Sequence, residues 1–355
     1  MQRVSRGYMI AFASAGLLAF TGIFIRHLTQ AYGLPPLTLA FWRNSFVVLT
    51  LLPFLALGRP ALLDLKRGEA FRLVIYGLAL AIFNSLWTLS VALAGATVAT
   101  VLVYSSGAFT VLLGWVFLGE RLDTWKLVAV GLALIGCGMV CGAWAPAIWR
   151  ANPLGLLAGV LSGLLYAIYT IMGSAASRRG VGPWTAVFYA FGFGACFLLL
   201  FDLASAWLFP TVGLGSSNLL WLGDQWIGWL TLFALAAGPT AAGFGLYNMS
   251  LGYLPASVVN LIVTLEPALT ALVAYALLGE RLTSSQMAGS LLVVSAVAVL
   301  RLTEIGRVST GLGSTRPGLA PAPSRAEFGD GNPPESDTAE KDHGRVDQDP
   351  VLPMY

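Results

Sequence analysis

The chain has 355 residues, of which 57% are hydrophobic and only 10% are charged, and its formal net charge is +3. Soluble domains carry about 25% charged residues, so the composition argues against a water-soluble fold. The apolar residues come in runs of roughly 20, the length an α-helix needs to cross the ~30 Å hydrocarbon core of a bilayer. We therefore expect an all-α polytopic membrane protein in which the basic excess is a topology signal, with no nucleic-acid partner.

The apolar runs predict ten transmembrane helices, separated by turn-forming segments rich in Gly and Pro. Their expected ranges are 8–28, 38–57, 72–92, 97–118, 126–144, 153–173, 184–208, 227–250, 257–278 and 286–302.

The distribution of Lys and Arg predicts the orientation of these helices. With the N-terminus inside, eleven fall on the cytoplasmic side, namely Arg3, Arg6, Arg59, Lys66, Arg67, Arg72, Arg121, Lys126, Arg178, Arg179 and Arg301. The three on the outer side are Arg26, Arg150 and Arg281. This positive-inside bias predicts a protein of the plasma (inner) membrane with both termini in the cytoplasm.

Two stretches of the chain follow the same pattern 160 residues apart. ATVATVLVYSSGAFTVLLGWVFLGERL at 96–122 aligns without a gap with ASVVNLIVTLEPALTALVAYALLGERL at 256–282, so Gly119–Leu122 falls on Gly279–Leu282. The register extends backwards and pairs Trp87 with Tyr247. Similarity at one fixed offset indicates a duplicated structural unit.

The duplication predicts an inverted repeat, because five spans per half is an odd number. Secondary transporters are built from such repeats, with a substrate site near the membrane midplane. We place the first five-helix repeat at 1–145 and the second at 146–302. Residues 303–355 are rich in Pro, Gly, Asp and Glu and poor in bulky apolar residues, which predicts a disordered cytoplasmic tail. A regulatory or partner-binding role for that tail is the alternative.

The ten spans, the five-plus-five duplication, the Leu265-Glu266-Pro267 turn and the repeated Leu-Gly-Glu-Arg-Leu resemble the EamA-type domains of the drug/metabolite transporter superfamily. The resemblance covers about residues 8–302. It implies a helical basket with a central cavity, and export or exchange of small metabolites such as amino acids or related amphipathic compounds. The first half has Ser106-Gly107 where the second has Glu266-Pro267, so the two halves are not expected to contribute equivalently.

Glu266 lies near the middle of its span and is the candidate coupling residue. An ionisable side chain there costs about 2.5–3.5 kcal/mol on insertion scales, which marks it as functional by default. Burial makes the charged form of a carboxyl group costly, so protons are the candidate coupling ion. A buried pair with an Arg, or a cap on a broken helix end, is the alternative.

Pro267 removes a backbone hydrogen bond and is expected to kink its helix, and Gly238-Pro239 forms the second predicted hinge. A static kink is the alternative for Gly238-Pro239. On an ideal helix Asn260 and Thr264 share one face, whereas Glu266 and Thr270 share another. Both faces therefore meet a cavity only if the helix bends.

Arg43 begins about 9 Å inside its span and is a candidate anion contact or partner for Glu266. Snorkelling to the outer headgroups is the alternative. The other predicted substrate-binding residues are polar or aromatic side chains within spans: Asn44, Trp87, Tyr104, Ser106, Thr110, Tyr247, Asn260 and Thr264. Packing or a place in the interface belt is the alternative for the aromatic residues.

No catalytic residues, metal site or cofactor are expected, because the chain has two histidines and lacks G-x-S-x-G, H-E-x-x-H and zinc-type Cys/His spacing. The main alternative to a transporter is a non-transporting membrane sensor or scaffold, which would give no flux of any compound. The expected partners are a small-molecule substrate and the lipid bilayer. Since one chain holds both repeats, it would act as a monomer or a homodimer.

Overall fold

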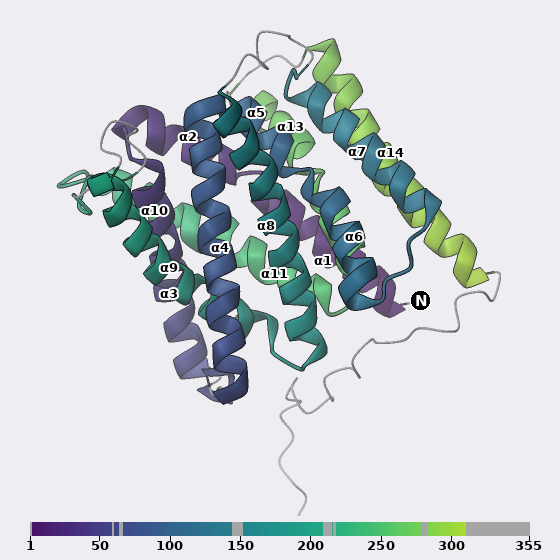
Figure 1. Ribbon diagram of the computed structural model, residues 1–355, viewed down its shortest axis with the longest axis horizontal. Coiled ribbons are helices and arrows are strands. Elements are labelled where there is room, and N and C mark those ends of the chain that lie inside the picture. Colours follow the sequence, from purple (N-terminus) through teal and green to yellow (C-terminus); the bar gives the residue numbers. More distant parts are fainter. Residues whose placement is uncertain are drawn as a thin grey trace, which may run out of the picture. The chain divides into compact units, whose positions relative to one another are not determined.

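A computed structural model describes residues 2–58, 60–63, 67–143, 152–208, 215, 218–278 and 283–309. Within these ranges the regular elements are all helices (Figure 1). They are α1 (Gln2–Leu18), α2 (Thr21–Tyr32), α3 (Pro36–Gly58), η1 (Pro60–Leu63), α4 (Arg67–Ala94), α5 (Ala96–Val103), α6 (Ser106–Leu118), α7 (Thr124–Val140), α8 (Pro153–Arg178), α9 (Pro183–Leu208), α10 (Trp226–Leu235), η4 (Ala236–Ala242), α11 (Gly243–Leu251), α12 (Ala256–Val263), α13 (Glu266–Leu278) and α14 (Ser284–Ser309).

Eight helical stretches of the described residues are long and apolar enough to cross a membrane, and each overlaps a predicted span. They are Val4–Tyr32, Pro36–Gly58, Gly68–Val91, Val98–Leu118, Pro153–Arg178, Pro183–Leu208, Trp226–Leu251 and Ala256–Val273. Two shorter apolar helices, Thr124–Val140 and Ser284–Val299, fall on the fifth and tenth predicted spans. The all-helical membrane architecture is confirmed, and the number of ten crossings stays a prediction.

The helix boundaries repeat at the offset found in the sequence. α5 and α12 cover 96–103 and 256–263, whereas α6 and α13 cover 106–118 and 266–278. α7 and α14 begin at 124 and 284. Each of these pairs differs by 160, so even the interruptions at 104–105 and 264–265 are equivalent. The duplication is therefore visible in the three-dimensional structure of this region.

Contacts between α6 and α12 show that the equivalent spans run in opposite directions. Ser106, the first residue of α6, donates from Oγ to Asn260 Oδ1 at 3.3 Å. Glu120, just beyond α6, accepts a hydrogen bond from the backbone N–H of Ala256, the first residue of α12, at 2.6 Å. The two helices α6 and α12 therefore run antiparallel. This is the relation expected of inverted repeats.

The ninth span is interrupted between Val263 and Glu266, directly before Pro267, where the proline is expected to kink the helix. The equivalent interruption between α5 and α6 forms at Tyr104-Ser105, with Ser106-Gly107 in place of Glu266-Pro267. Pro267 lies in the first turn of α13, where the missing N–H removes no intrahelical bond. A break of this kind can therefore form without a proline, and whether Pro267 acts as a hinge stays a prediction.

The other predicted hinge, Gly238-Pro239, lies within the π-helical segment η4. Pro239 has no N–H to donate to the carbonyl of Leu235, four residues earlier. The Thr240 hydroxyl donates to that carbonyl instead, at 2.9 Å. π-Helical segments within α-helices often mark functional sites, and whether this one moves stays a prediction.

α7 and α14 lie side by side (Figure 1) and touch through their backbones. A Cβ added to Gly136 would lie 2.7 Å from the Gly289 carbonyl oxygen, and one added to Gly289 would lie 2.6 Å from the Gly136 carbonyl oxygen. Small residues permit such close crossings between helices in membranes.

The last helix changes one predicted boundary. α14 continues to Ser309, so helix extends past residue 302, after which the composition predicts the tail. The rest of that tail, from residue 310, lies outside the described residues, as does the second signature copy, Gly279–Leu282.

We predict that Gly136→Ala and Gly289→Ala each destabilise the protein, because the new methyl group meets backbone that cannot rotate away. Overpacking of this kind typically costs about 1–3 kcal/mol. Thermal unfolding in detergent measures the effect. Gly131→Ala on α7 is the matched control, since nothing lies within 4 Å of an added Cβ there. An equal effect in all three variants would contradict a tight glycine crossing.

Candidate functional site: a central cavity

A cavity of about 1760 Å³ lies among the helices, with walls from α2, α3, α4, α5, α8, α11 and α13. Its lining runs from interior residues such as Arg43 and Glu266 to residues 33–36, Trp221 and Gln286 at helix ends and connections. The cavity thus opens at the end of the bundle that carries these connections. In the orientation predicted from the distribution of Lys and Arg, this end of the bundle is on the outer side of the membrane.

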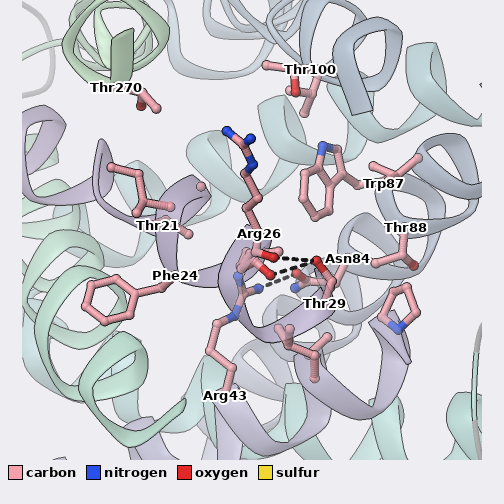
Figure 2. A pocket seen from close by; sticks show the side chains of 18 of the residues that line it. Thr21, Phe24, Arg26, Thr29, Arg43, Asn84, Trp87, Thr88, Thr100 and Thr270 are labelled. Carbon is pink, nitrogen blue, oxygen red and sulfur yellow. Dashed lines mark hydrogen bonds between the residues drawn. The ribbon is translucent and has the colours of Figure 1, made fainter. Parts of the chain in front are cut away.

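Arg43 and Asn84 form the polar floor of the cavity. Only 8% of Arg43 is exposed, and its guanidinium Nη2 donates to Asn84 Oδ1 at 2.6 Å (Figure 2). In the described structure Arg43 Nε and the hydroxyl oxygen of Thr21, another lining residue, are buried without a hydrogen-bond partner. Arg43 is therefore buried and bonded rather than snorkelling, with donor capacity to spare beside the cavity.

Glu266 is the first residue of α13 and lines the same cavity. Its carboxyl group interacts electrostatically with Arg43 and lies beside Tyr104. Among the described residues, however, no ion pair within 4.0 Å joins Glu266 to Arg43. The direct pair that the sequence suggested as one option is absent in this conformation, and both charges face the cavity.

Helix α2 supplies lining residues that sequence reasoning did not single out. Nearly all residues from Thr21 to Gln30 line the cavity, among them Arg26. Figure 2 shows the Arg26 side chain extending into the space between Thr100 and Thr270. The available signal was Arg26 itself, a basic residue near the outer end of the first predicted span.

Aromatic rings make up much of the remaining wall. Trp87, Tyr104, Phe83, Tyr166 and Phe244 line the cavity, and Phe83 stacks on Tyr166 with ring centroids 5.1 Å apart. A wall of this kind offers apolar surface next to the charged groups at the floor. In the described part of the chain no group of three or more His, Cys, Asp or Glu residues could hold a metal ion.

Residues at equivalent positions of the two repeats differ in whether they line the cavity. Trp87, Tyr104 and Glu266 line the cavity, whereas their repeat equivalents Tyr247, Thr264 and Ser106 do not. The same holds for Thr100 against Asn260 and for Thr270 against Thr110. In each of these five pairs only one member lines the cavity, whereas both members of the equivalent pair Asn84 and Phe244 line it.

The members that do not line the cavity are buried in the protein. Ser106 contacts Asn260, whose Nδ2 donates to Thr170 Oγ1 at 3.3 Å, and that hydroxyl lies 2.6 Å from the Tyr247 hydroxyl. Thr264 bonds its own helix through the Leu261 carbonyl at 2.6 Å. Two predicted residues, Asn44 and Thr110, are buried with side-chain polar atoms that lack partners in the described structure. Whether any of these residues binds substrate stays a prediction.

The fold and the cavity together define a polytopic membrane protein built around a solute-sized chamber. Residues 5–142 and 153–302 match the EamA-like transporter family, and the chain belongs to that family. It is 29% identical over 290 residues to an uncharacterized transporter of Archaeoglobus fulgidus, covering 81% of this chain and 93% of the relative. It is 30% identical over 219 residues to an uncharacterized transporter of Synechocystis sp., covering 62% of each. A crystal structure shares the fold, with a TM-score of 0.68 at 18% identity over 84% of this chain and 97% of that one.

The native cysteines test the direction in which the cavity opens. Cys141 lines the cavity and Cys137 is fully buried, and thiol reactivity follows exposure. We expect a membrane-impermeant maleimide added on the mouth side to modify Cys141 at least about tenfold faster than Cys137. Peptide mass spectrometry on the Cys196→Ser variant, which removes the exposed third thiol, measures both rates. Equal rates, or modification only from the opposite side, would contradict the assigned mouth.

Proposed function

We propose that this protein is a secondary active transporter that exports small amphipathic metabolites, amino acids or related compounds, by alternating access through the central cavity. The observation that carries the proposal is the division of repeat-equivalent residues between the cavity lining and the packed interior. A duplicated transporter is expected to be open on one side of its pseudo-symmetric site and closed on the other. Exchanging the roles of the halves would expose Ser106, Asn260 and Tyr247 to the opposite side.

The helices of the two interrupted spans, α5–α6 and α12–α13, support the alternating-access proposal. α5 and α13 line the cavity, whereas their equivalents α12 and α6 pack against each other away from it. In the described structure no comparable packing joins α5 to α13. With ten crossings and cytoplasmic termini, as the positive-inside bias predicts, this conformation is open to the outside.

Charge at the floor favours a substrate with an anionic group. Arg43 has a donor without a partner next to the cavity, and charge-assisted hydrogen bonds to carboxylates are the strong ones. Glu266 offers a carboxyl group to an ammonium group of the substrate or to a proton. The aromatic wall would hold an apolar side chain. Proton coupling through Glu266 is one part of this proposal. If Glu266 does not couple transport to protons, exchange of substrates without a coupling ion becomes the favoured mechanism.

Removing the carboxyl group at the floor tests the transport cycle. We expect cells that express the wild type, but not the Glu266→Gln variant, to release a metabolite in a way that depends on the pH gradient. Metabolite profiling of medium and cells at two external pH values measures this. Glu69→Gln is the matched control, because Glu69 bonds Arg72 and Arg179 and lies outside the lining. Equal, equally pH-dependent release by all variants would remove Glu266 from coupling. No release beyond an empty vector would favour a sensor or scaffold.

Removing the cation at the floor tests the anionic contact. We expect Arg43→Gln to raise the KM for the transported compound roughly 10- to 100-fold, the factor that corresponds to loss of a hydrogen bond to a charged group. Initial uptake rates in proteoliposomes provide the measurement. Arg72→Gln is the control, because Arg72 is more than half exposed and lies outside the cavity lining. An unchanged KM would place the substrate's anionic group elsewhere.

A further inference from the structure

The end of the bundle opposite the cavity mouth holds a buried glutamate that no part of the proposed substrate site uses. Glu120 is the third letter of the Leu-Gly-Glu-Arg-Leu signature and is only 8% exposed. Gly119 ends α6 with a left-handed backbone (φ 66°), which suits glycine because it has no Cβ. The Glu120 N–H then bonds back to the Gly114 carbonyl at 3.0 Å. This turn directs the Glu120 side chain toward the other repeat.

The Glu120 carboxylate holds the start of α12. Oε1 accepts from the backbone N–H of Ala256 at 2.6 Å, and Oε2 accepts from the Ser257 hydroxyl. Lys126 donates to Ser257 Oγ at 3.0 Å and lies 3.5 Å from Glu120 Oε2. A carboxylate satisfies the free N–H groups of a helix N-terminus and is stabilised by the helix dipole. We call Glu120, Lys126, Ala256 and Ser257 the clamp.

The packing around the clamp places the Glu120 carboxyl group close against α6. A Cβ on Gly114 would lie 3.1 Å from the Glu120 carboxyl carbon, so the carboxyl group rests against a glycine. Arg178 of α8 donates to the Leu118 carbonyl at 2.9 Å, which satisfies a free backbone group at the end of α6. Both ends that meet at the clamp are thus bonded within the protein.

The position of the clamp favours a role in controlling access to the cavity rather than in binding the substrate. α12 has only eight residues, about 12 Å of helix, between the clamp and the break that precedes Glu266. None of the clamp residues lines the cavity, and the packed contact of α6 with α12 lies between the clamp and the cavity floor. The clamp therefore fastens the first repeat to the second at the closed end.

We propose that the clamp is the latch of the closed gate, so that release of Glu120 from Ala256 and Ser257 is required to open the α6–α12 end of the transport path. Glu120 acts here as a positioning residue that holds two helix ends together and touches no substrate. The proposal gives the signature motif a physical task, since its glycine makes the turn and its glutamate reaches across the pseudo-symmetry axis.

Two-sided cysteine labelling tests the latch without a substrate. One reporter is native Cys141 on the mouth side, and the other is Ser106→Cys beneath the clamp, each as the sole cysteine of the chain. We expect Glu120→Gln and Ser257→Ala to raise maleimide labelling of the Ser106→Cys reporter from the clamp side about tenfold or more. Labelling of Cys141 from the mouth side should fall at the same time. Glu69→Gln should change neither rate.

The paired readout separates a shifted gate from a damaged fold. A variant that only loosens the structure would raise both rates, and that result would overturn the proposal. Unchanged rates at both reporters would overturn it as well. Because no flux is measured, the outcome is independent of whether a transported compound is found, and a working latch in a protein without flux would contradict the transporter proposal alone.

Discussion

The fold depends on one constraint, which is that a backbone group facing lipid has no water to bond. Interrupted helices are tolerated at membrane depth only where protein or a wet cavity supplies partners. Here Thr270 donates to the Ala19 carbonyl at the break between α1 and α2, at 2.9 Å. The hydroxyl of Thr240 in η4 donates to the carbonyl of Leu235 at the end of α10. The Cys137 thiol lies 3.7 Å from the Thr264 carbonyl oxygen at the break before α13. The breaks are thus confined to the bundle interior, where the cavity lies.

Much of this architecture could be predicted from the sequence, because hydrophobic length and a fixed repeat offset are strong signals. The register that pairs Gly119 with Gly279 also predicts the equivalent ends of α5 and α12. The choice between equivalent residues could not be predicted. Tyr104 lines the cavity and Thr264 does not, because the two halves pack differently in this conformation. The sequence is the same in every conformation, so it does not tell which one the structure shows. The lining supplied by α2, including Arg26, was missed because the sequence placed Arg26 at the outer end of one continuous span, 8–28.

The two carboxylates of the broken spans, Glu120 and Glu266, have separate physical tasks. Glu266 faces an open chamber with Arg43 nearby, so its charge can respond to what enters. Glu120 is enclosed by a helix N-terminus, a hydroxyl group and Lys126, so its charge is balanced within the protein. The first arrangement suits an exchangeable ligand, and the second suits a mechanical contact between repeats. In keeping with these tasks, Glu120 is buried whereas Glu266 is only partly buried.

The second repeat does not carry all the same residues as the clamp at the equivalent positions. The sequence has Ala274 at the position equivalent to Gly114 and Gln286 at the position equivalent to Lys126. A closure built with those residues would have a methyl group where the clamp has a bare glycine, and it would have no lysine for the ion pair. Every difference of about 1.4 kcal/mol between two closures changes their population ratio tenfold. In the proposed alternating-access cycle, these two differences would favour the closure described here over its repeat-equivalent one in the empty protein.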